Sequence, residues 1–143
     1  MRTRIVLIAG VIIALIGGAY AWKEYNRTAK DAGAMQEVLT VSAHELQREF
    51  RANEQAANAK YVGTTDQAIK VKGMIRAIEP AEEGRTNVLL DSGEENSAVV
   101  CEFSADALPK SWAAGQNVFL KGICTGVNDL IPDVILVRCS AVE

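Results

Sequence analysis

The chain has 143 residues, of which 49% are apolar and 23% are charged, and its formal net charge is -3. From Asp31 to Glu143, ten Lys and Arg residues stand against seventeen Asp and Glu residues, so the part that follows the N-terminus is distinctly acidic. This length suits one domain, and the acidic balance argues against a non-specific nucleic-acid-binding protein, which needs a basic surface.

The N-terminus contains an uncharged, mostly apolar run, Ile5–Trp22, between Arg4 and Lys23. Spanning a bilayer takes about 20 apolar residues, with a range of about 17–25, so this run is short but adequate. Arg2 and Arg4 precede it, and basic flanks stay in the cytoplasm. We therefore expect residues 1–22 to be a single-pass anchor in a bacterial inner membrane. The lipid bilayer surrounds Ile5–Trp22, the N-terminus is cytoplasmic and the C-terminal domain is periplasmic.

A cleavable signal peptide is the alternative interpretation of the same run. It has the same basic start and apolar centre, and Ala19-Tyr20-Ala21 resembles a cleavage site. Both interpretations place the domain outside the cytoplasm. A lipid-modified cysteine is not expected, because no cysteine precedes Cys101.

Residues 23–40 have mixed charges and little periodicity, and we interpret them as a tether to a domain over residues 41–143. This domain starts with a well-marked helix. Ser42 and Glu45 form a capping box, and Val41 and Leu46 have the spacing of a hydrophobic staple. Apolar residues at helical spacing predict one amphipathic helix over 42–61; they are Leu46, Phe50, Ala57 and Tyr61.

After the helix the hydrophobic period changes to two, which predicts strands. Five strands are expected, at Ile69–Ile75, Asn87–Asp91, Ala98–Phe103, Asn117–Cys124 and Asp133–Ala141. A short helix or turn at Ala105–Trp112 separates the third strand from the fourth. This order is typical of the OB-fold, a small Greek-key barrel. The expected fold is therefore mainly β with an N-terminal helix: a five-stranded OB-fold-like barrel preceded by a transmembrane helix.

Several phrases of the sequence resemble one known family. They are ELQREFRANEQAANAKYVG (Glu45–Gly63), IKVKGMI (Ile69–Ile75), VVCEF (Val99–Phe103) and the stretch from GQNVFLKGICTG to DVILVRCSAV (Gly115–Val142). Together they resemble the tRNA_anti-like family of bacterial OB-fold proteins, many of which are anchored or exported. The resemblance implies an OB-fold and a fate outside the cytoplasm, and it supplies no catalytic residues.

The three cysteines all fall on the inward faces of predicted strands. In an oxidising compartment disulfides form and persist, and Cys124 and Cys139 lie on consecutive strands that form a hairpin. We expect these two to be bonded, with Cys101 a free thiol or an alternative partner. Two other interpretations remain open: buried thiols that pack as small hydrophobes, and redox or metal chemistry, which the absence of a C-x-x-C motif disfavours.

The candidate binding surface consists of Lys70, Lys72 and Arg76, which point outward from the first predicted strand, and Phe119, an aromatic residue outside the expected core. They could hold an anionic ligand or partner, or form an ordinary solvated face. His44 is the only histidine, so no metal site of the usual composition is expected. No catalytic set is recognisable either, and we expect neither an enzyme nor a cofactor.

These features favour a membrane-anchored, periplasm-facing binding or adaptor module, whose partner is another envelope protein or a small ligand. OB-folds bind through the second and third strands and the loops beside them, here the surroundings of Glu79–Arg85, Val88–Phe103 and Thr125–Pro132. Two alternatives are a protein that binds single-stranded nucleic acid and a thiol-active envelope protein. The acidic domain and the few exposed aromatic residues make nucleic acid the weaker of the possible partners.

Overall fold

The computed structural model describes residues 13, 15–22, 36–62 and 67–143. Residues 15–22 are helical and exposed. Among the residues that the structure describes, no helix is long and apolar enough to cross a bilayer. Residues 1–12 and 14 of the expected anchor, and residues 23–35 of the expected tether, lie outside the described part.

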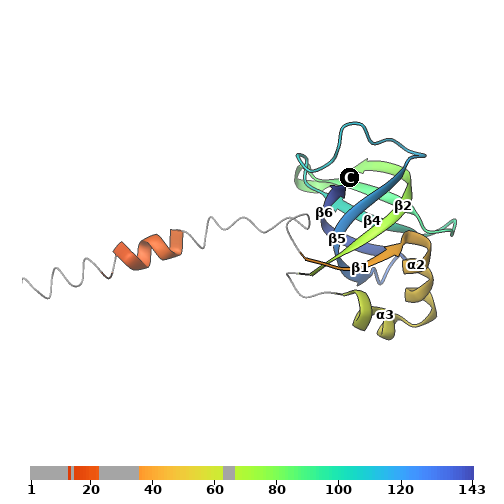
Figure 1. Cartoon of the computed structure of the whole chain (residues 1–143), viewed down its shortest axis with the longest axis horizontal. Helices are drawn as coiled ribbons and strands as arrows, with labels where there is room; N and C mark the ends of the chain where they lie inside the picture. Colours follow the sequence, from red (N-terminus) through yellow and green to blue (C-terminus); the bar gives the residue numbers. More distant parts are fainter. Residues whose placement is uncertain (1–12, 14, 23–35, 63–66) are drawn as a thin grey trace, which may run out of the picture.

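The rest of the described chain is a β domain with two short helices (Figure 1). In chain order its elements are β1 (Gln36–Ser42), α2 (Ala43–Ala52), α3 (Glu54–Tyr61), β2 (Gln67–Pro80), the short 3-10 helix η2 (Glu82–Gly84), β3 (Thr86–Asp91), β4 (Ala98–Phe103), β5 (Asn117–Val127) and β6 (Val134–Val142). The five predicted strands correspond to β2 to β6.

Five of the strands close into a barrel. The sheet order is β1-β2-β3-β4-β6-β5. A further pairing of β2 with β5 closes β2, β3, β4, β6 and β5 into the barrel and leaves β1 at its edge. β2 reaches both neighbours because it is long: Ile69–Met74 pairs with β5, and Ile75–Pro80 pairs with β3. The β4–β6 pair is parallel, and the other pairs of the barrel are antiparallel. The predicted OB-fold-like barrel is confirmed.

A glycine lies where β2 passes from one neighbour to the other. A Cβ atom on Gly73 would approach the Ala43 Cβ to 3.0 Å and the Leu90 Cδ1 to 3.1 Å. Only glycine therefore leaves room for the start of α2 to pack directly on the sheet.

One strand was not expected from the sequence. β1 pairs with the first half of β2 in parallel, on the edge that β5 does not use. Residues 36–40 thus belong to the sheet and not to the tether, and Val41 is buried in the core. Parallel pairing with a later strand gives no local signal such as a hairpin turn, which is why the short edge strand escaped notice.

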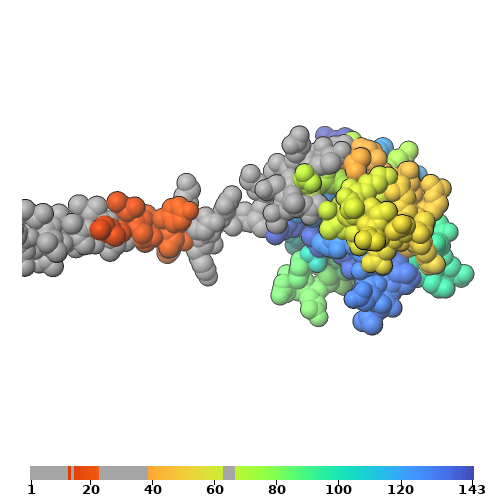
Figure 2. All heavy atoms as spheres, turned by 90° about the horizontal axis from the view of Figure 1, so that it is seen from below, coloured from red at the N-terminus to blue at the C-terminus, as the bar shows by residue number. Residues whose placement is uncertain are grey.

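The predicted single helix over 42–61 is two helices. Asn53 has extended backbone angles (φ -161°, ψ 96°), and its side chain caps the second helix by accepting a hydrogen bond from the Ala56 N–H. The predicted apolar stripe is nevertheless buried as a unit, including Leu46 and Phe50 of α2 and Tyr61 of α3. α2 contacts β1, β2, β3, β4 and β6, so it covers one end of the barrel (Figures 1 and 2).

The segment predicted as a short helix or turn, Ala105–Trp112, consists of turns. Residues 104–116 form turns, and this segment packs on the core through Trp112, which meets Phe103 edge to face at a centroid distance of 5.7 Å. The two N-terminal helices supply the helical cover in this domain.

The three cysteines are buried as predicted, but the expected disulfide is not present. Cys101 and Cys124 are free thiols. Cys124 lies opposite Leu136 in the β5–β6 register, whereas the Cys139 sulfur packs over Gly122. The register of the hairpin is the cause: Lys121 pairs with Ser140, so Cys139 comes level with Gly122 and not with Cys124. β6 is also irregular at Arg138, which has a positive φ of 53°. Such a bulge shifts the phase of the strand: Val134 and Leu136 point inward before it, and Cys139 points inward after it.

Candidate functional site

The outer face of β3 and β4, through which OB-folds usually bind ligands, is occupied here by side chains that contact one another. The outward residues of β3 and β4 include Asn87, Leu89 and Val100, all half-buried. At the edge of this face the Arg85 guanidinium donates to Glu102 at 3.0 Å and to Glu83 at 2.8 Å. No large aromatic side chain is exposed on this face among the described residues. It therefore offers neither a free cation nor a stacking platform.

The structure brings together three of the four residues predicted as a binding surface. Phe119 of β5 lies opposite Lys72 of β2, and its ring is 39% exposed. The Nζ atoms of Lys70 and Lys72 lie 5.3 and 5.6 Å from the centroid of this ring. Neither lysine forms an ion pair with a carboxylate of the described chain. We call Lys70, Lys72 and Phe119 the β2–β5 patch.

Arg76, the fourth predicted residue, serves a different purpose. Its guanidinium donates to the Asp91 carboxylate at 2.8 Å and to the backbone carbonyls of Glu94 and Ser97 at 2.8 and 2.9 Å. The Arg76 guanidinium, and next the Gly93 backbone N–H, lower the pKa of Asp91 below its usual range. Arg76 therefore ties the β3–β4 connection to β2 and does not belong to the β2–β5 patch.

A shallow hollow of about 390 Å³ adjoins the β2–β5 patch at Lys72. Its walls come from the β1–α2 junction, β2, the end of β3 and the start of β5, and include Ser42, His44, Met74 and Asn117. Met74 is 41% exposed. His44 lies here as an exposed side chain whose Nε2 is 3.6 Å from Asp91 Oδ2. The hollow extends the surface over which a ligand held by Lys72 could make contact.

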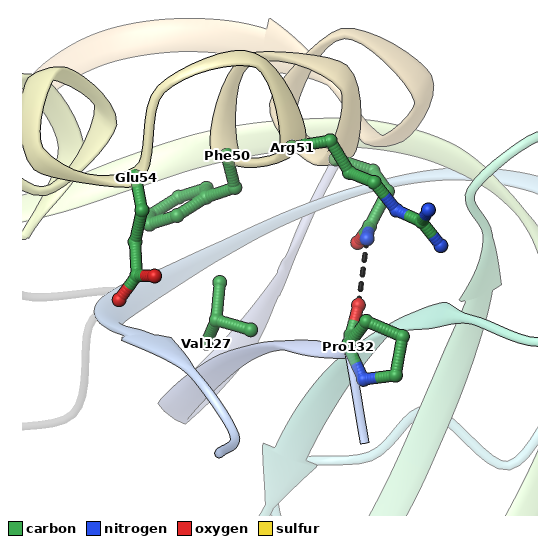
Figure 3. A pocket seen from close by; sticks show the side chains of 6 residues that line it. Phe50, Arg51, Glu54, Val127 and Pro132 are labelled. Atoms are coloured by element: carbon green, nitrogen blue, oxygen red, sulfur yellow. Dashed lines mark hydrogen bonds between the residues drawn. The ribbon is translucent and has the colours of Figure 1, made fainter. Parts of the chain in front are cut away.

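A second hollow, of about 290 Å³, lies between α2 and the β5–β6 connection (Figure 3). Phe50, Arg51 and Glu54 border it from the helical side, and Val127 and Pro132 border it from the barrel (Figure 3). Gln47 completes the lining and is only 1% exposed.

Only the nitrogen of the Gln47 side-chain amide forms a hydrogen bond. Its Nε2 donates to the Pro132 carbonyl at 2.6 Å, but its buried Oε1 has no hydrogen-bond partner among the described residues. This residue was not predicted from the sequence. A signal was available, because Gln47 stands four residues after Ala43 and three before Phe50, on the buried stripe of α2.

The buried thiols lack the features of reactive cysteines. Burial raises the pKa of Cys124 to about 11, whereas nucleophilic cysteines have lowered pKa values and partial exposure. Within the described ranges, no group of His, Cys, Asp and Glu side chains could hold a metal ion.

Comparison with known proteins connects this geometry to a family. The tRNA_anti-like family matches residues 1–141. The chain belongs to this family. No curated protein matches the sequence. The OB-fold barrel with its N-terminal helices is therefore the tRNA_anti-like domain of this chain, as the resemblance of its helix and strand phrases implied.

Solved structures share the fold at low sequence identity. One is the "putative nucleic acid-binding lipoprotein" of Klebsiella pneumoniae subsp. pneumoniae MGH 78578. It is 21% identical with a TM-score of 0.58, and the match covers 78% of this chain and 94% of that one. Another is the Stn1–Ten1 complex of S. pombe, with 22% identity, a TM-score of 0.38, and coverage of 53% and 58% of the two chains. The first likeness supports the tRNA_anti-like barrel as a fold.

Proposed function

We propose that this tRNA_anti-like protein is a non-enzymatic adaptor of the bacterial envelope. Ile5–Trp22 holds it in the inner membrane with the barrel in the periplasm, and the β2–β5 patch binds an acidic segment of another envelope protein. The observation that carries this proposal is the pair of lysine ammonium groups, Lys70 and Lys72, gathered over one exposed aromatic ring without a carboxylate partner.

The contrast with the other cations supports this assignment. Lys60, Arg51, Arg76 and Arg85 each pair with a carboxylate of the domain. Arg48, Lys110 and Arg138 are exposed, but no described aromatic ring lies beneath their charges. In an acidic domain, two unneutralised ammonium groups on an apolar ring provide both charge and contact area for an anionic ligand.

Fluorescence anisotropy with two labelled polyanions tests the proposal. Polyglutamate represents an acidic protein segment, and the protein is the full chain in mild detergent. We expect binding that weakens as salt rises. The double variant K70Q/K72Q should bind roughly 2- to 30-fold more weakly, because an exposed ion pair contributes about 0.2–1 kcal/mol and 1.4 kcal/mol is tenfold. R48Q, which removes an exposed cation elsewhere, is the control. Equal binding by all three proteins would contradict the proposal.

Single-stranded nucleic acid is the second candidate ligand, and Phe119 is the observation that favours it. Bases stack on exposed aromatic rings beside cations in single-strand-binding OB-folds, and the Klebsiella protein of the same fold bears a nucleic-acid-binding name. Labelled oligothymidylate is the second probe in the same assay. If it binds more tightly than polyglutamate, and F119A removes that binding, the nucleic-acid function replaces the adaptor function.

The topology has its own test. Alkaline phosphatase reaches its active form only outside the cytoplasm. A fusion of this enzyme after Glu143 should therefore be active in cells if the domain is periplasmic. The same fusion without residues 1–22 is the control and should be inactive. An inactive full-length fusion would refute the periplasmic location. The third possibility, a thiol-active protein, is disfavoured by the burial and raised pKa of Cys124.

A further inference from the structure

The hollow between α2 and the β5–β6 connection contains a buried acceptor that lacks a donor. Leaving a buried polar atom unsatisfied destabilises a fold, and a leucine at the position of Gln47 would avoid that cost. The Pro132 carbonyl already accepts from Nε2, so exchanging the two amide atoms would not satisfy Oε1. The wall of the hollow at Gln47 therefore contains an acceptor that no donor of the described residues satisfies.

The charges that surround the hollow are negative where they are unpaired. Arg51 is neutralised by an ion pair with Glu94. Glu54 and Asp129 are exposed, and neither forms an ion pair within the described part of the chain. An occupant of the hollow therefore meets the Glu54 carboxylate and the Gln47 carbonyl oxygen. Asp129, on the connection that borders the hollow, adds a second negative charge. Together these groups select a cationic donor.

The connection that borders the hollow also presents apolar side chains to solvent. Leu130 is 92% exposed and Ile131 is 50% exposed. Hydrogen bonds hold the connection in this conformation. The Asn128 backbone N–H donates to the Asp133 carbonyl at 3.1 Å, and the Leu130 N–H donates to the Asn128 side chain at 3.0 Å. Apolar residues held outward beside a hollow are typical of a surface that meets a partner.

The size of the hollow indicates what kind of partner fits. Sites for small molecules usually measure about 300–1,000 Å³, so 290 Å³ is at their lower limit. It suits one side chain, and the apolar residues Leu130 and Ile131 beside it suit a ligand that continues along the surface. Both properties describe a segment of polypeptide better than a free metabolite.

We propose that this hollow docks a basic and apolar segment of a partner protein. One apolar side chain of the segment packs between Phe50 and Val127, an N–H of the segment donates to Gln47 Oε1, and an adjacent Lys or Arg lies against Glu54 and Asp129. This site shares no residue with the β2–β5 patch and takes a partner of opposite charge, so it goes beyond the proposed function and does not depend on it.

Selection from a displayed library of random hexapeptides tests the docking site. The full chain in mild detergent is the bait. We expect the selected peptides to combine Lys or Arg with Leu, Ile or Phe. A selected peptide should bind at least about 5-fold more weakly to Q47M, which keeps the shape of the side chain but removes the acceptor, and to E54Q. The control Q55M changes an exposed glutamine of α3, next to Glu54, and should bind like the wild type, as should K70Q/K72Q.

Several results would overturn this proposal. They are the enrichment of acidic peptides, the enrichment of no peptide over a parallel selection with the Q47M/E54Q double variant, and equal binding by Q47M, E54Q and Q55M. Because Q47M could disturb packing, its unfolding midpoint is measured as well, and L130S provides an independent loss of binding at a side chain that is exposed and does not support the core. Loss through K70Q/K72Q alone would assign the peptide to the β2–β5 patch.

Discussion

Arg76 and Asp91 show how a charged pair at the surface can be structural. The Asp91 carboxylate accepts from the Arg76 guanidinium and from the Gly93 backbone N–H, so its charged form is stabilised in the folded domain. The sequence placed Arg76 correctly on β2 but could not indicate its partner, because the β3–β4 connection folds back over β2 only in three dimensions. Alternation of residue types gives the face of a strand and not the contacts of a long side chain.

The lowered pKa of Asp91 predicts a pH dependence of stability. Its contribution is complete above the unfolded pKa of about 3.9 and is lost as the pH falls through the lower folded pKa. We therefore expect the difference in unfolding free energy between the wild type and D91N to be constant near neutral pH and to shrink below about pH 4. Urea unfolding followed by circular dichroism between pH 2.5 and 7 measures it. A difference that grows in acid would contradict this role.

At the scale of elements, local signals were read correctly where the deciding partners lie nearby in sequence. Ser42 caps α2 by accepting from the Glu45 N–H, as its capping box predicts. The break at Asn53 carries the same kind of signal, since asparagine is a favoured N-cap residue. It was missed because the apolar stripe continues across the break and suggests a single helix.

The cap at Asn53 predicts a specific loss of stability. N53A removes the acceptor for the Ala56 N–H, so it should lower the free energy of unfolding by about 1 kcal/mol. N53D keeps a capping oxygen and should remain close to the wild type, and Q55A controls for a change at an exposed position of α3. Chemical unfolding of the four proteins measures the effect. A smaller loss for N53A than for N53D would show that the cap does not stabilise the break.

The packing of β5 against β6 depends on the absence of a side chain at Gly122. A Cβ atom there would lie 2.7 Å from the Cys139 sulfur and 3.0 Å from the Leu136 Cβ. We expect G122A to destabilise the domain by about 1–3 kcal/mol, as overpacking of a core does. Adding C139A should recover part of that loss, because it removes the nearest atom.

A double-mutant cycle separates this steric effect from a general weakening of the core. The unfolding free energies of G122A, C139A and G122A/C139A give the coupling, which we expect to be at least about 0.5 kcal/mol in favour of the pair. C101A removes the sulfur atom of a different buried cysteine, and the losses in unfolding free energy of C101A and G122A should be additive. Additivity in both pairs would mean that Cys139 does not oppose the added methyl group.

At the scale of the whole molecule, the barrel was accessible to sequence analysis and the site only partly so. Five segments of alternating hydrophobicity, in their order along the chain, are enough to predict an OB-fold. This works because the alternation shows which face of each strand is buried. The gathering of Lys70 and Lys72 around Phe119 depends on the β2–β5 register, which alternation does not give. The disulfide prediction was wrong for a similar reason: the β5–β6 register places Cys139 level with Gly122 and not with Cys124, and alternation alone does not give that register.

The unexpected edge strand β1 predicts where the folding unit begins, and this can be measured. β1 contributes the buried Val41, the N-cap Ser42 and a ladder along Ile69 to Lys72, so a chain that begins at Ala43 loses all three. Burial of a valine side chain contributes about 1.5–3 kcal/mol and a cap about 1 kcal/mol. A protein of residues 43–143 should therefore be at least about 2 kcal/mol less stable than one of residues 36–143 in urea. Residues 36–143 should match the full chain in detergent. Equal midpoints for the two truncated proteins would show that β1 is an accessory to the barrel, and the domain would then begin at α2.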